Sequence, residues 1–209
     1  MRQGVLARLS VDRVEMQLRD GTPVTVRPIL PADRELIRTG FQRLSEESRL
    51  RRFLAPISKL SEGQLDYLTN VDYWDHFAWV GVRTDDPDVG MGVARYVRLP
   101  SEPSVAESAV TILDEYQRRG LGTLLLGLLA AAARTAGIES FRAYVLEENA
   151  PMRGLLAGLG ARASFDSPGV VRVDIPLDPD QMPDSPVARA VKAMAAKVMP
   201  GSKQSEGGN

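Results

Sequence analysis

A short polar segment with two glycines, Gln117-Arg118-Arg119-Gly120-Leu121-Gly122-Thr123, stands directly before a long apolar run. Glycine lets the backbone approach a ligand closely and adopt torsion angles that other residues resist. The start of a helix offers unpaired N–H groups and the positive end of the helix dipole, which together bind phosphate oxygens. Residues 105–113 are strand-like and lead into the segment. The pattern therefore predicts a strand, a phosphate-binding turn and a helix.

One residue excludes two familiar phosphate-binding motifs. A Walker loop has the pattern G-x-x-x-x-G-K-[ST], and a dinucleotide fingerprint has the pattern G-x-G-x-x-G. Counted from Gly120, Leu125 occupies the last glycine position of both patterns. For the segment alone, two interpretations stay open: a phosphate-binding turn, or a helix start whose glycines only permit close packing.

The remaining pattern, Q-R-R-G-L-G-T, resembles the pyrophosphate loop [QR]-x-x-G-x-[GA] of the GNAT superfamily, the acetyl-CoA-dependent N-acetyltransferases. The next part of the chain continues the resemblance: strand-like residues 140–146, then Asn149, then a short helix that ends at Leu159-Gly160-Ala161. Residues 26–33 and 44–53 resemble the opening of the Pat-type bacterial protein lysine acetyltransferase domain.

The resemblance covers roughly residues 14–176 and implies one α/β domain with the GNAT fold. In this fold, helices cover both faces of a mixed, mostly antiparallel central sheet. We expect the domain to occupy residues 1–177. Residues 178–209 are expected to form a proline-rich linker, a short amphipathic helix and a disordered tail. The sequence leaves open whether that helix packs on the domain or docks on a partner.

Periodicity and turn signals predict the individual elements. Strands are expected near residues 14–18, 24–28, 76–83, 90–98, 105–113, 140–146, 161–165 and 169–176. Helices are expected near residues 31–44, 46–54, 61–70 and 150–158, and after the glycine segment up to Gly137.

Glu107 is the candidate general base. It lies in an otherwise apolar or small-residue strand, ten residues ahead of Gln117, where Pat-like GNAT domains place their base. Strand alternation puts Glu107, Ala109 and Thr111 on one face. We expect the apolar neighbours to remove the carboxylate partly from water. The alternative is a strand-edge glutamate that faces solvent.

The resemblance implies that acetyl-CoA is the acyl donor. Backbone groups of Val110 and Ile112 would pair with the pantetheine arm, as an added strand does. The N–H groups of residues 118–123 would hold the pyrophosphate, and Asn149 would bind the cofactor arm, although it could equally be a helix N-cap. No tyrosine follows Asn149, so the acid for the leaving thiolate is unassigned. The residues assigned to cofactor binding are Val110, Ile112, Gln117, Arg118, Arg119, Gly120, Leu121, Gly122, Thr123 and Asn149.

Composition excludes several classes of function. A net charge of −1 provides no field for nucleic acid or an anionic membrane surface. The chain has no cysteine and one histidine, so we expect no disulfide and no metal site. Residues 121–133 are too short an apolar run to cross a bilayer, and no secretory signal opens the chain. We therefore expect a cytoplasmic protein without nucleic-acid or membrane partners; a homodimer stays open.

The acceptor is less defined than the donor. The Pat resemblance implies a primary amine, with a protein lysine as the expected acceptor. A small-molecule amine is the alternative, and so is a non-catalytic acyl-CoA-binding module that regulates a partner. Neither the acceptor nor the preferred acyl chain can be identified from a sequence pattern.

Two further features, an arginine cluster and the single histidine, each fit two interpretations. Arg49, Arg51 and Arg52 fit a solvated helix face paired with neighbouring glutamates, or a contact with an acidic partner or phosphate. His76 follows two aromatic residues and fits simple packing better than a role in the acceptor site.

Overall fold

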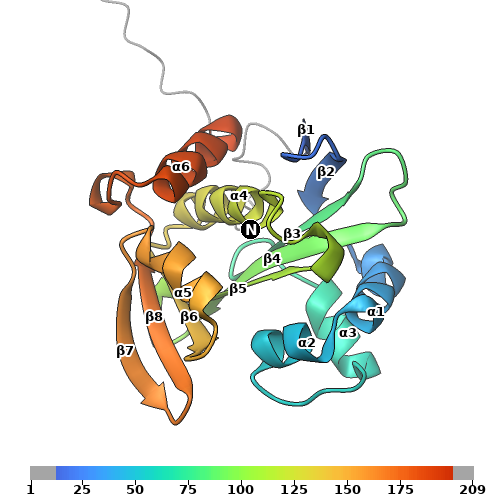
Figure 1. Cartoon of the computed structure of the whole chain (residues 1–209), viewed down its shortest axis with the longest axis horizontal. Helices are drawn as coiled ribbons and strands as arrows, with labels where there is room; N and C mark the ends of the chain where they lie inside the picture. The colour runs from blue at the N-terminus through green and yellow to red at the C-terminus, as the bar shows by residue number, and fades with distance from the viewer. Residues whose placement is uncertain (1–12, 200–209) are drawn as a thin grey trace, which may run out of the picture.

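Within residues 13–199, the part of the chain that the computed structural model describes, eight strands form one mixed sheet (Figure 1). The N-terminal dozen residues and the predicted disordered tail, residues 200–209, lie outside this range. The strands are β1 (Val14–Gln17), β2 (Pro23–Pro28), β3 (His76–Arg83), β4 (Gly90–Leu99), β5 (Glu102–Ile112), β6 (Ser140–Leu146), β7 (Arg162–Ser167) and β8 (Val170–Pro176). Their order across the sheet is β1-β2-β3-β4-β5-β6-β8-β7.

The β5–β6 pair is parallel, whereas the other neighbouring strands are antiparallel. This parallel pairing is short, since it joins only Val105, Ala106 and Glu107 to residues 140–142. Beyond Glu107 the two strands separate, and in Figure 1 β6, β8 and β7 form a wing that diverges from the other five strands. The predicted mixed, mostly antiparallel α/β sheet is confirmed.

Helices cover both faces of the sheet, as predicted. They are α1 (Arg34–Arg43), α2 (Glu46–Phe53), α3 (Glu62–Thr69), α4 (Leu121–Thr135), α5 (Ala150–Ala157) and α6 (Pro186–Val198), with 3-10 turns η2 (Pro31–Asp33), η3 (Asp114–Tyr116) and η4 (Pro179–Gln181). Helices α1 to α3 lie together on one face, and α4 packs on the opposite face against β3, β4 and β5 (Figure 1).

Local chemistry fixes several helix boundaries. Ser61 caps α3 and forms a capping box with Gln64, as the sequence predicts. Ser45 caps α2 in the same way through the N–H of Ser48. Helix α4 ends before Gly137, whose positive φ of 79° suits glycine at a helix C-terminus. The expected elements are therefore present, with ends that differ by a few residues.

Helix α4 is apolar on nearly all sides because it is buried on nearly all sides. Its residues 124–133 are buried between the sheet and α6. No helix in the described range has the length and hydrophobicity to span a lipid bilayer.

Helix α6 packs on α4 and belongs to the same hydrophobic core through Ala188, Val191, Ala195 and Val198. The sequence left this placement open. The approach is close at Gly127 of α4, because a Cβ there would stand 2.7 Å from Cβ of Met194 and 2.8 Å from the Val191 carbonyl oxygen.

We expect Gly127→Ala to destabilise the protein. Alanine normally stabilises a helix interior by about 1 kcal/mol relative to glycine, but here the added methyl meets backbone atoms and forces α6 outward. The expected result is a Tm lower by roughly 3–10 °C in a calorimetric scan. Gly154→Ala in α5 is the matched control, since nothing lies within 4 Å of its added Cβ; its Tm should stay equal or rise. A Gly127→Ala protein as stable as the wild type would contradict this packing.

Candidate active site

Strand β5 has a free edge where it has separated from β6. The N–H of Leu113 donates to the carbonyl of Met91 in β4 at 2.9 Å, whereas the carbonyl of Ile112 accepts from Nε2 of Gln117 at 3.2 Å. Since backbone groups alternate sides along a strand, those of Ser108, Val110 and Ile112 point away from β4 into the gap. The predicted positions of Val110 and Ile112 thus suit an added extended chain.

The glycine segment forms the turn between β5 and α4, as the sequence predicts. Gly120 is the N-cap of α4 with a φ of 97°, and Arg118 also has a positive φ, of 61°. Among the described residues no acceptor is paired with the N–H groups of residues 118–123, which include Leu121, Gly122 and Thr123. These donors and the helix dipole make the turn suitable for an anion.

The two arginines of this turn have different surroundings. Arg119 is ion-paired with Asp20 at 2.5 Å, and its carbonyl accepts from the N–H of Arg19 at 3.1 Å. Arg118 is exposed. The side chain of a third arginine, Arg19, lies beside Gly120 and adds positive charge near the turn. No local pattern indicates it, because it comes from the distant β1–β2 connection.

The Gln117 side chain holds the turn together. Its Nε2 donates to the Ile112 carbonyl at 3.2 Å, to Oδ1 of Asp114 at 3.2 Å and to Oγ of Ser48 at 3.3 Å. Asp114 in turn accepts from the N–H of Ser45 and from Oγ of Ser48, which ties the turn to α2. A cofactor contact by the Gln117 side chain would compete with these bonds; its predicted cofactor role remains a prediction.

Asn149 is buried at the start of α5. Its Oδ1 accepts from the N–H of Met152 at 3.3 Å, which is the N-cap geometry. Nδ2 has no hydrogen-bond partner within residues 13–199, so the proposed ligand contact is compatible with the cap. The cofactor contact itself stays a prediction.

Glu107 is the last β5 residue paired with β6, where it stands opposite Arg142, and on its other side it stands opposite Val97 in β4. The expected removal of its side chain from water is wrong, because Glu107 is exposed. The side chain shares a face with Ala109 and Thr111, as predicted.

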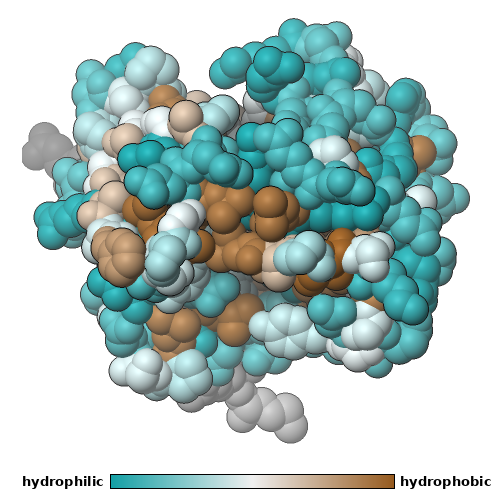
Figure 2. Space-filling model, turned by 60° about the horizontal axis from the view of Figure 1, so that its bottom comes forward, coloured by the Kyte–Doolittle hydropathy of each residue, from teal (hydrophilic) through white to brown (hydrophobic). Residues whose placement is uncertain are grey.

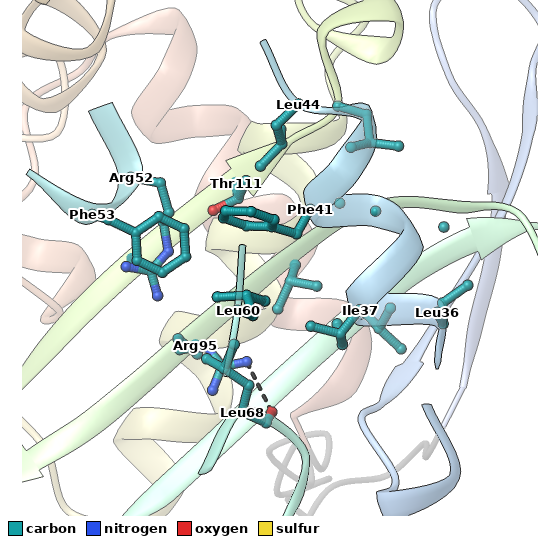
Figure 3. A pocket seen from close by; sticks show the side chains of 17 residues that line it. Leu36, Ile37, Phe41, Leu44, Arg52, Phe53, Leu60, Leu68, Arg95 and Thr111 are labelled. Atoms are coloured by element: carbon teal, nitrogen blue, oxygen red, sulfur yellow. Dashed lines mark hydrogen bonds between the residues drawn. The ribbon is translucent and has the colours of Figure 1, made fainter. Parts of the chain in front are cut away.

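An open pocket lies on that same face, between α1 to α3 and the sheet. Figure 3 shows its walls, which are mostly apolar, and Figure 2 shows a hydrophobic band across a hollowed, otherwise hydrophilic face. The apolar residues labelled in Figure 3 are Leu36, Ile37, Phe41, Leu44, Phe53, Leu60 and Leu68.

Two arginines, Arg52 of α2 and Arg95 of β4, also line this pocket. Arg95 is 6% exposed and donates to Nε2 of His76 at 2.9 Å and to the Leu68 carbonyl at 3.0 Å. Arg52 lies over the Phe53 ring at 4.9 Å. No carboxylate in the described range forms an ion pair with either side chain. No sequence pattern predicts a role for Arg95, because only the pairing of β4 with β5 places this residue at the pocket.

The solvated-face interpretation of the α2 arginines holds for Arg51, which pairs with Glu47. Arg49 lies over the Phe41 ring at 5.0 Å and donates to the Gln42 carbonyl. The interpretation is wrong for Arg52, which turns toward the sheet instead.

Burial in the pocket lowers the pKa of His76 and of both arginines. Burial, together with the charge of Arg52, lowers the pKa of Arg95 to about 9. Burial also lowers the pKa of Arg52, and the charge of Glu107 opposes that shift. Burial and the charge of Arg95 lower the pKa of His76 to about 4. His76 is therefore neutral near pH 7, accepts at Nε2 and carries its proton on Nδ1.

No group of three His, Cys, Asp or Glu side chains able to hold a metal ion occurs within residues 13–199. The arrangement instead combines a carboxylate, a free strand edge, a turn with unpaired N–H groups and an apolar pocket with two cations.

Comparisons with known proteins give one consistent answer. Residues 42–161 match the model of the acetyltransferase (GNAT) family. Acetyltransferase Pat of Mycolicibacterium smegmatis is 37% identical over 174 residues, 83% of this chain and 52% of that protein, so the chain spans about half the length of this relative. An acetyltransferase of Pseudomonas aeruginosa is 34% identical over 160 residues, which cover 76% of this chain and 86% of that protein.

Among solved structures, the GNAT domain of S. lividans PAT superposes with a TM-score of 0.73 at 30% identity. The match covers 78% of this chain and 96% of that domain.

We expect the imidazole of His76 to titrate with a midpoint near pH 4 in the folded protein, below the ordinary value of about 6.5. Because the unfolded chain binds the proton more readily, this residue favours unfolding as the pH falls from about 6.5 to 4. With one histidine in the chain, its NMR signal needs no assignment. Arg95→Gln should raise the midpoint by removing a positive charge, whereas Arg51→Gln should not. A wild-type midpoint near 6.5 would contradict the burial described above.

Proposed function

Because the chain belongs to the acetyltransferase (GNAT) family, we propose that it transfers the acetyl group of acetyl-CoA to a primary amine, with Glu107 as general base. The observation that carries this proposal is the separation of β5 from β6 directly after Glu107. The free edge of β5 then runs from the carboxylate to the anion-binding turn, which is the path that a pantetheine arm and its pyrophosphate require.

In the proposed complex, the pantetheine amides pair with the backbone of Val110 and Ile112 in place of β6. The pyrophosphate lies on the N–H groups of residues 118–123 at the start of α4. Arg118 is the exposed cation available to phosphate, because Arg119 is already paired with Asp20. Asn149 donates from Nδ2 to the cofactor arm while its Oδ1 continues to cap α5.

The reaction requires a neutral amine. For a lysine-like amine with a pKa of about 10.4, reaching the neutral form at pH 7 costs about 4.6 kcal/mol. Glu107 accepts the proton directly or through one water, the nitrogen forms a bond to the thioester carbon, and the C–S bond breaks. A general base of this kind contributes roughly 10²- to 10⁴-fold in rate.

The leaving group needs less help. A thiol has a pKa of about 8.5, so coenzyme A leaves readily as a thiolate. Tyr144, a half-buried residue of β6, is opposite Arg172 in the sheet. We assign no general acid.

The acceptor class remains the open part of the proposal. A protein lysine follows from the sequence resemblance to Pat-type domains. A small-molecule amine is favoured by a specific observation, the open and mostly apolar pocket lined by Ala109 and Thr111, which share a strand face with Glu107. A non-catalytic acyl-CoA-binding module would need no carboxylate at the position of Glu107.

We expect Glu107→Gln to lower kcat/KM for acetyl transfer at pH 7 by roughly 10²- to 10⁴-fold, because the amide cannot accept the proton. Affinity for coenzyme A should stay within about threefold of the wild-type value. The measurement is thiol release with a panel of lysine peptides, polyamines and amino acids. Glu102→Gln is the control, since that exposed carboxylate on the same strand pairs with Arg142. If no amine releases thiol from the wild-type protein, the enzyme proposal fails; if Glu107→Gln keeps full activity, the base is assigned wrongly.

We expect Gly120→Ala to weaken coenzyme A binding by roughly 5- to 30-fold, measured by calorimetry. The added Cβ has room, but a φ of 97° is strained for alanine, so the turn and its N–H groups rearrange. Gly137→Ala is a matched control with a φ of 79° at the other end of α4 and nothing within 4 Å. It should lower Tm and leave the affinity unchanged. Equal affinities for all three proteins would place the pyrophosphate elsewhere.

A further inference from the structure

The pocket between α1 to α3 and the sheet has one apolar end and one charged end. Gly90, at the start of β4, faces Leu36, and together they mark the apolar end. Arg95 lies further along β4 and stands opposite Ala109 of β5. Figure 3 shows Arg52 and Arg95 at the end of the pocket away from Leu36.

The charged end points toward Glu107. Glu107 stands two residues before Ala109 in β5. Its side chain therefore lies on the same face of the sheet, about 7 Å away along the strand. Electrostatic attraction between Arg52 and Glu107 supports this proximity. The two cations therefore lie at the end of the pocket that is nearer to the candidate base, which stands just outside the residues that line it.

The charge of Arg95 is not compensated by the protein. The side chain is nearly inaccessible, and its hydrogen-bond partners are a neutral imidazole and a backbone carbonyl. A buried guanidinium without a carboxylate is costly, and a bound carboxylate offsets that cost through charge-assisted hydrogen bonds. Arg52, which stacks on Phe53, adds a second positive charge at the same place.

Resting on the proposed function, we propose that the acceptor is a small α-amino acid with an apolar side chain. Its carboxylate pairs with Arg95 and Arg52, its amine faces Glu107, and its side chain extends along Phe41 toward Leu36. An amine and a carboxylate on one carbon match a base and two cations at one end of an otherwise apolar pocket. The reaction would form the N-acetyl amino acid and release coenzyme A.

The test compares three matched ligands. L-phenylalanine carries both groups, L-phenylalaninamide lacks the carboxylate, and 3-phenylpropanoate lacks the amine; L-leucine, L-leucinamide and 4-methylpentanoate repeat the set with a smaller side chain. Thiol release should be roughly 10- to 100-fold faster in kcat/KM for an amino acid than for its amide. The two amine-free acids should bind in calorimetry and inhibit competitively against the amino acid.

Arg52→Gln and Arg95→Gln should each weaken binding of 3-phenylpropanoate by roughly 10- to 100-fold and reduce the preference for L-phenylalanine over L-phenylalaninamide in kcat/KM by a similar factor. Arg51→Gln, on the same helix but paired with Glu47 at the surface, should behave as the wild type. Arg52 is half-buried, so its variant keeps the test valid if Arg95→Gln fails to fold.

The binding experiment does not depend on acetyl transfer, so the two proposals fail separately. Carboxylate binding without any thiol release supports the pocket assignment and overturns the enzyme proposal. Three results would overturn the pocket assignment. The amino acid and its amide could be turned over equally, the amine-free acids could fail to bind, or Arg52→Gln could bind those acids as tightly as the wild type. A lysine peptide turned over faster than every amino acid overturns the acceptor class and leaves acetyl transfer intact.

Discussion

The interruption of sheet pairing after Glu107 is the constraint on which the rest of the site depends. A strand edge with unpaired N–H and C=O groups is costly inside a protein unless another chain or a ligand pairs with it. Here the antiparallel partner β4 holds β5 in place on one side, while β6 leaves it on the other. The same divergence leaves the edge of β5 unpaired from Glu107 to the turn at Gly120, and the face that carries Ala109 lines the pocket.

Local sequence was sufficient to predict the elements and the turn. The glycine segment, the capping box at Ser61 and the C-terminal Gly137 each specify their own backbone through short-range chemistry, and the structure has them where the sequence indicates. Strand alternation also placed Glu107, Ala109 and Thr111 on one face of β5, as the register has them. Family resemblance then supplied the order of the pieces, which periodicity alone does not determine.

Properties that depend on long-range packing could not be predicted in the same way. The exposure of Glu107 depends on which elements cover its face of the sheet, and the burial of Arg95 on the helices packed over its position opposite Ala109. Arg52 and Arg51 are neighbours on one short helix, yet one lines the pocket and the other pairs at the surface. A charged residue in a sequence gives no sign of which side of its helix will meet the sheet.

The packing of α6 on α4 has a consequence for how the chain matures. Helix α6 follows β8 in the chain, so until α6 docks the strip of α4 around Gly127 is an exposed apolar surface. Such a surface attracts chaperones and other incompletely folded chains while the protein folds.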